Sequence, residues 1–78
     1  MQTFNIVFET FINDPKIKSW ILKGKSTTNI ESDCEGGPVE TFNRFVTMIH
    51  EQEKMKYSHG TDVNIIILNI INLSHLFS

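Results

Sequence analysis

A second cysteine is missing from this sequence, which has only Cys34 among its 78 residues. One thiol cannot form an intrachain disulfide, so the class of small secreted domains held together by disulfides is excluded, and a reducing, cytoplasmic compartment is favoured. Cys34 lies between Asp33 and Glu35, whose negative charges disfavour a thiolate. We therefore do not expect a cysteine nucleophile.

An excess of positive charge is also missing. Seven Lys and Arg against nine Asp and Glu give a formal net charge of -2, which argues against general electrostatic binding to nucleic acid. The charges are nevertheless segregated into a basic run followed by an acidic run. The basic run is Lys16, Lys18, Lys23 and Lys25, and the acidic run is Glu31, Asp33, Glu35 and Glu40. Such runs are usually solvated surface, but either one can steer a partner of opposite charge.

No apolar run is long enough for a membrane-spanning helix. The longest candidate, residues 63–77, contains three asparagines and falls short of the roughly 20 residues that a span needs. The N-terminus lacks the basic start of a signal peptide, and Glu9 interrupts its apolar stretch. We expect neither a signal peptide nor insertion into a membrane.

Motifs for catalysis and for cofactor binding are scarce. Gly36-Gly37-Pro38 lacks the spacing and the lysine of a phosphate-binding loop. The three histidines, His50, His59 and His75, are nine and sixteen residues apart, which matches no zinc site. The loop carboxylates alternate along the chain with nothing to enclose them, so they do not suggest acid–base catalysis. We expect no enzyme activity, no metal and no cofactor.

The clearest element that is present is an amphipathic helix over residues 38–52. Pro38 suits its first position, where a missing N–H costs nothing. At 100° per residue, five apolar side chains fall within an arc of about 120°. These are Val39, Phe42, Phe45, Val46 and Ile49. His50 flanks this arc and is predicted to be a partly buried structural histidine, whereas Glu53 falls inside it, where core contact should end.

Three other segments predict strands. Residues 3–12 alternate, with Phe4, Ile6, Phe8 and Ile12 on one face. The other face is half apolar, because Val7 and Phe11 share it with Asn5 and Glu9. Residues 15–23 fit either a short helix or a strand, and we favour the second strand of a hairpin. Residues 63–73 are rich in Val and Ile, which favours a strand. Both of its faces are largely apolar, which predicts a place in the centre of the sheet.

These elements predict one small α+β domain over residues 1–78. The sheet is three-stranded, antiparallel or mixed, with the element order β-β-α-β, and one amphipathic helix packs on one face. The helix cannot cover the second face, where Val7, Phe11 and the last strand are apolar. A second subunit would cover it, so we expect a homodimer.

The function favoured by the sequence is that of a small non-enzymatic interaction module that binds a larger protein. Six aromatic and acidic residues are predicted to contact the partner. They are Phe8, Phe11, Trp20, Glu31, Asp33 and Glu35. Small solitary proteins rich in Asn, Ile and Lys fit AT-rich genomes, which suggests a phage or viral inhibitor or modulator of a host protein.

Two other functions remain open. Lys16, Lys18, Lys23 and Lys25 surround Trp20 in the sequence, which is typical of a small stacking platform for nucleic acid. Alternatively, the chain is a purely structural homo-oligomer that uses Val7, Phe11 and the final strand as its contact.

Overall fold

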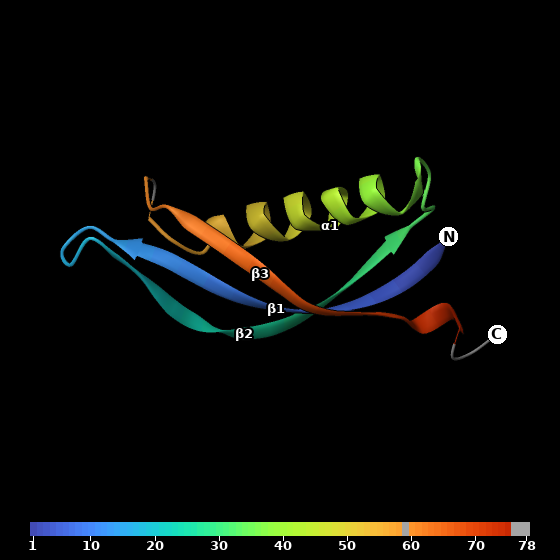
Figure 1. Cartoon of the computed structure of the whole chain (residues 1–78), viewed down its shortest axis with the longest axis horizontal. Helices are drawn as coiled ribbons and strands as arrows, with labels where there is room; N and C mark the ends of the chain where they lie inside the picture. Colours follow the sequence, from blue (N-terminus) through green and yellow to red (C-terminus); the bar gives the residue numbers. More distant parts are fainter. Residues whose placement is uncertain (59, 76–78) are drawn as a thin grey trace.

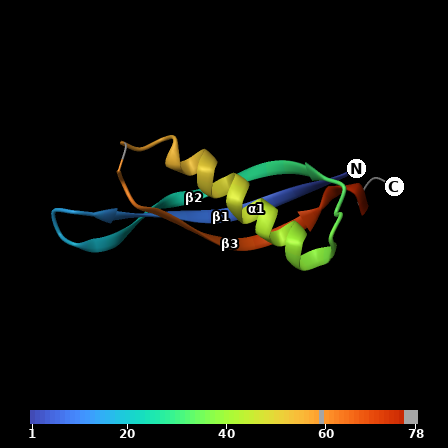
Figure 2. The same cartoon turned by 90° about the horizontal axis from the view of Figure 1, so that it is seen from above.

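A computed structural model describes residues 1–58 and 60–75 of the chain. Strand β1 (Gln2–Asp14) is followed by β2 (Ser19–Ser32), helix α1 (Gly37–Lys54), β3 (Val63–Asn72) and a short 3-10 turn, η1 (Leu73–His75). The three strands form one antiparallel sheet in the order β2-β1-β3. Helix α1 lies diagonally across one face of this sheet (Figures 1 and 2). The predicted α+β fold is confirmed.

The ambiguous segment after β1 is a hairpin, as favoured from the sequence. Its strands pair from Gln2–Ser32 to Asp14–Ser19, so the turn is residues 15–18. The Asp14 side chain closes this turn, because its Oδ1 accepts a hydrogen bond from the Lys16 N–H at 2.8 Å. Asp14 therefore acts as a turn residue, one of the roles that Asp side chains often take.

The predicted central position of the last strand is wrong, because β1 is the central strand. Helix α1 carries the chain from β2 over β1 to the free edge of β1, where β3 pairs. Strand β1 thus has a neighbouring strand on each side and apolar side chains on both faces. Strand β2, at one edge of the sheet, carries three charged side chains. They are Lys23, Lys25 and Glu31. The outward apolar side chains of β3 remain exposed.

The core lies between α1 and the sheet. It is formed by Ile6 and Phe8 of β1, Ile30 of β2, Phe45 and Ile49 of α1, and Ile65 of β3. Phe8 is only 1% exposed, so its predicted role as a partner contact is wrong. The reason is the strand alternation, which turns every second side chain of β1 towards α1.

The buried stripe of α1 differs from the predicted apolar arc. It consists of Thr41, Phe45, Ile49 and Glu53, while Val39 is 73% exposed. Thr41 is accommodated because its hydroxyl donates to the Gly37 carbonyl oxygen at 2.8 Å. Because Thr41 and Glu53 are polar, apolar periodicity alone does not predict this stripe.

The expectation that core contact of the helix ends at Glu53 is also wrong, because Glu53 is buried. Its side chain is 3% exposed, its Oε1 accepts a hydrogen bond from the Thr10 hydroxyl at 2.6 Å, and its Oε2 lies 2.5 Å from Lys56 Nζ. Burial raises the pKa of Glu53, but the hydrogen bonds from Lys56 and Thr10 and the charge of Lys56 outweigh this and lower the pKa overall.

His50 is partly buried, as predicted. Its Nε2 lies 2.7 Å from the Val63 carbonyl oxygen, which joins α1 to the start of β3. His59 lies outside the described residues.

Candidate interaction surfaces

The face of the sheet opposite α1 is covered by no element of the described chain (Figure 1). The register places Phe11 opposite Leu22 of β2 and Glu9 opposite Ile66 of β3, and Trp20 lies at the end of the same face, opposite Asn13. Trp20, Leu22 and Ile66 are each about half exposed, at 49%, 50% and 49%. We call Phe11, Trp20, Leu22 and Ile66 the hairpin patch.

The other half of this face carries mostly polar side chains, together with the exposed Ile71 of β3, which pairs with Asn5. The Asn5 side-chain amide donates to Thr27 Oγ1 at 2.8 Å and to Asn29 Oδ1 at 2.9 Å. Val7 pairs with Thr27 on one side and Asn69 on the other, so it is isolated among polar side chains. The apolar pair Phe11–Leu22, with Trp20 beside it at the end of the face, is therefore the apolar centre of the hairpin patch, and Ile71 lies apart from it.

All four lysines of the basic run are exposed and lie in the same half of the molecule as this patch. Lys16 and Lys18 are in the turn, Lys25 pairs with Glu9 on the uncovered face, and Lys23 is the extra residue at a bulge in β2. Together with Trp20, these lysines therefore belong to one hairpin.

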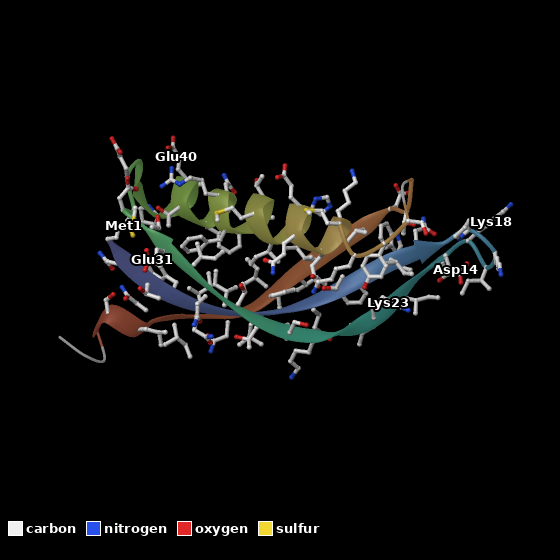
Figure 3. All side chains as sticks on the ribbon, turned by 180° about the vertical axis from the view of Figure 1, so that it is seen from behind. Met1, Asp14, Lys18, Lys23, Glu31 and Glu40 are labelled. Atoms are coloured by element: carbon white, nitrogen blue, oxygen red, sulfur yellow. The ribbon has the colours of Figure 1, made fainter. Side chains whose placement is uncertain are left out.

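The acidic run lies at the opposite end of the molecule, whose longest dimension is 49 Å. Figure 3 shows Glu31 and Glu40 at one end and Lys18 towards the other. Glu31 belongs to the uncovered face, whereas Asp33 and Glu35 lie in the loop before α1. The structure therefore does not gather the predicted aromatic and acidic contacts into one site. An extended strand advances about 3.3 Å per residue, and β2 separates Trp20 from Glu31.

Sequence reasoning missed an apolar groove beside the acidic loop. This groove has a volume of about 350 Å³ and lies where the start of α1 meets the sheet. Its lining is Phe4, Cys34, Gly37, Pro38, Thr41, Phe42, Phe45 and Ile70. Phe42 is exposed although it belongs to the predicted apolar arc. The reason is that the buried stripe of α1 runs through Thr41 and Phe45 and leaves Phe42 at its side.

The acidic loop is held by short-range hydrogen bonds. The Cys34 N–H donates to Ser32 Oγ and the Glu35 N–H donates to Asp33 Oδ1, both at 3.0 Å. Arg44 Nη2 donates to the Glu35 carbonyl oxygen at 2.5 Å. A polar hollow on this loop is lined by Asp33, Glu35, Gly36, Glu40 and Arg44. The groove and the hollow share no lining residue, but Cys34 of the groove lies between Asp33 and Glu35 of the hollow in the chain, so the two adjoin at this loop.

A third hollow, lined by His50, Glu51, Lys54, Tyr57 and neighbouring residues, lies at the other end of α1. Within residues 1–58 and 60–75 no group of three or more His, Cys, Asp or Glu side chains is placed to hold a metal ion. Within the same ranges, no helix combines the length and the apolar character needed to cross a membrane. Comparison of the chain with protein-family models, with curated proteins and with solved structures found no match.

Proposed function

We propose that this chain is a non-enzymatic interaction module that binds a larger protein through the uncovered face of its sheet. The observation that supports this most directly is the hairpin patch, in which half-exposed Trp20 and Leu22 adjoin Phe11 and Ile66. Contiguous exposed apolar surface of this kind marks interaction sites, and Trp is the side chain most enriched at their energetic centres.

The acidic residues have a different role in this proposal from that of the aromatic ones. Glu31 lies at the far end of the uncovered face, where a partner that spans the sheet would meet it. Asp33 and Glu35 act at longer range and speed the approach of a basic partner. The single Cys34, which is not in a disulfide, supports a cytoplasmic site of action, and the composition supports a modulator of phage or viral origin.

The test is capture of a partner from nuclease-treated lysate by the wild-type chain and by the double variant Trp20→Ser/Leu22→Ser. We expect the wild type to retain a stoichiometric protein partner and the variant to lose it. The matched control is Val39→Ser/Met55→Ser, which removes two highly exposed apolar side chains outside the sheet and should capture the partner normally. Equal capture by a folded Trp20→Ser/Leu22→Ser variant would contradict the proposal.

Nucleic-acid binding is the second candidate, because four exposed lysines and Trp20 occupy the same half of the molecule. This function predicts oligonucleotide binding that weakens steeply with salt. Lys23→Glu/Lys25→Glu should abolish the binding, and Lys54→Glu, a charge reversal on α1, should not. Absence of binding at low salt rules this candidate out.

A second copy of the chain is a competing occupant of the uncovered face, as the predicted homodimer requires. In that case sedimentation equilibrium would report a dimer for the wild type and a monomer for Trp20→Ser/Leu22→Ser. If a larger protein binds this face, the wild type should capture that protein in the lysate experiment, whatever its own oligomeric state.

A further inference from the structure

The turn of the β1–β2 hairpin presents an apolar side chain between two cations. Ile17 is 61% exposed, and Lys16 and Lys18 flank it in a turn that projects at one end of the molecule (Figures 1 and 3). We call residues Lys16, Ile17 and Lys18 the hairpin tip. Ile17 is not part of the core, because the hairpin end that carries it extends beyond the end of α1 (Figure 1).

The conformation of the hairpin tip is fixed before any partner binds. The Lys16 N–H donates to Asp14 Oδ1 at 2.8 Å and the Lys18 N–H donates to the Asp14 carbonyl oxygen at 2.7 Å. Asp14 is the acidic residue closest to the tip in the sequence, and its carboxylate is engaged by the turn. A preformed tip loses little conformational entropy on docking, which favours binding.

The opposite end of the same chain has the complementary features. The apolar groove between Phe4, Phe42 and Ile70 has a volume of about 350 Å³, which is large enough to admit an isoleucine side chain. Its border includes the loop that bears Asp33 and Glu35. Glu40 lines the adjoining polar hollow together with Asp33 and Glu35, and Arg44, whose Nη1 lies 4.0 Å from Glu40 Oε2, neutralises part of their charge.

We propose that a second copy of this chain occupies the groove, with the hairpin tip of one copy docked at the start of α1 of the next. Ile17 enters the apolar groove beside Phe42, and Lys16 and Lys18 face the carboxylates of Asp33, Glu35 and Glu40. Charge complementarity selects this occupant, because the chain itself supplies an apolar residue between two lysines. A molecule 49 Å long cannot bring its own tip to its own groove.

This contact is heterologous, since it joins two different surfaces of the same chain. It uses neither Trp20 nor Leu22 and therefore does not rest on the proposed function. Each docking leaves one free tip and one free groove in the complex, so association continues with concentration unless the copies close on themselves.

Two charge-reversal variants test the contact by complementation. The tip variant is Lys16→Glu/Lys18→Glu, and the groove variant is Glu35→Lys/Glu40→Lys. Sedimentation velocity over a concentration series should show self-association of the wild type and an apparent dissociation constant raised about tenfold or more in each variant alone, as expected when charges at a docking site become like-signed. An equimolar mixture of the two variants should associate again, with the variants in alternating order. The native tip of the groove variant meets the native groove of the tip variant, and the reversed tip meets the reversed groove.

Three further variants distinguish this contact from association through the uncovered face and from a general effect of surface charge. Ile17→Ser removes only the anchor and should weaken association while leaving the exposed turn folded. The matched control Glu51→Lys/Lys54→Glu reverses two exposed charges on α1 and should associate like the wild type. Trp20→Ser/Leu22→Ser should also associate normally. Thermal unfolding of every variant establishes that it is folded.

Several outcomes would overturn the proposal. A wild-type chain that remains monomeric at the highest concentration has no such contact. Association that is lost in Trp20→Ser/Leu22→Ser but kept in Ile17→Ser places the second copy on the uncovered face instead. Folded tip and groove variants that fail to form a complex with each other show that their charges do not meet.

Discussion

Glu53 places a carboxylate at the packed interface between α1 and the sheet, where Thr10 and Lys56 contact it. An unpartnered charge at such a position would be costly, and the hydrogen bonds make it tolerable. The periodicity of apolar residues treats Glu53 as the end of the buried stripe, because a sequence does not reveal that a threonine from a distant strand will face it. At the scale of single residues, polar members of the core are what pattern reasoning misses.

This arrangement predicts a pH dependence of stability. The pKa of folded Glu53 is lowered from its ordinary value of 4.5, so its contribution to the free energy of unfolding is fully present above that value. The contribution is lost as the pH falls through the lower folded pKa. Urea unfolding from about pH 7 to about pH 2.5 should show a loss of stability in this acidic range that is smaller in Glu53→Gln. Parallel curves for the two proteins would contradict the prediction.

The partner of Glu53 gives a second prediction. Thr10→Val keeps the shape of the side chain and removes the donor to Glu53 Oε1, so it should lower the free energy of unfolding by about 1–3 kcal/mol. Thr47→Val, at an exposed position of α1, is the matched control and should change stability less. Urea denaturation at neutral pH measures both, and equal losses would show that the hydrogen bond to Glu53 contributes nothing.

Phe8 and Phe42 differ in burial, which gives a third prediction. Phe8→Ala should cost about 3–5 kcal/mol because it leaves a cavity in the core. Phe42→Ala removes an exposed ring and should cost much less. The same denaturation experiment compares them, and equal losses would show that the ring of Phe42 is part of the core.

At the scale of elements, the strands and the helix follow from the sequence, and the hairpin is the favoured one of the two structures that residues 15–23 fit. The order of the strands does not, because an apolar character on both faces fits a central strand as well as an exposed edge. The structure places β3 at the edge, since β1 has a neighbour on each side. Exposed Ile66 and Ile71 of that strand are then available as contact surface and are not part of the core.

The hairpin turn gives a prediction at this scale. Lys18 has a φ of 52°, a left-handed conformation that costs an L-residue roughly 1–2 kcal/mol and costs glycine far less. Lys18→Gly should therefore raise the free energy of unfolding, by about 0.5–1 kcal/mol once the greater freedom of unfolded glycine is included. Ser19→Gly, one residue later in β2, should lower it. A destabilised Lys18→Gly would contradict the assigned turn.

At the scale of the whole molecule, the basic and acidic runs are separated along the long axis. Lys18 lies at the hairpin end, together with Asp14, and Glu31 and Glu40 lie towards the end where α1 starts (Figure 3). The sequence shows both runs, but it joins the acidic run with Trp20 into one site, because residues 20 and 31 are close in number. An unbroken strand of 14 residues puts them far apart. The separation places Trp20 and the acidic run, which were predicted to contact one partner together, on different parts of the molecule.

This polarity predicts that self-association responds to salt. The Debye length shortens from about 30 Å at 0.01 M to about 3 Å at 1 M ionic strength, so the attraction between the hairpin tip and the acidic border weakens. The sedimentation coefficient at fixed protein concentration should fall towards the monomer value as salt is raised. An association that strengthens with salt would indicate an apolar contact, such as one through the uncovered face.

The two ends of the sheet also differ in how they can be attached to something else. The Thr3 N–H donates to Ser74 Oγ at 3.0 Å, and the Asn72 side-chain amide donates to Gln2 Oε1, so the start of β1 and the end of β3 lie together. A tag, fused domain or solid support attached next to the start of β1 or the end of β3 therefore sits at the end of the molecule that carries the acidic loop. The same chain immobilised in this way would display its lysine-bearing turn outward, as the part of the molecule farthest from the support.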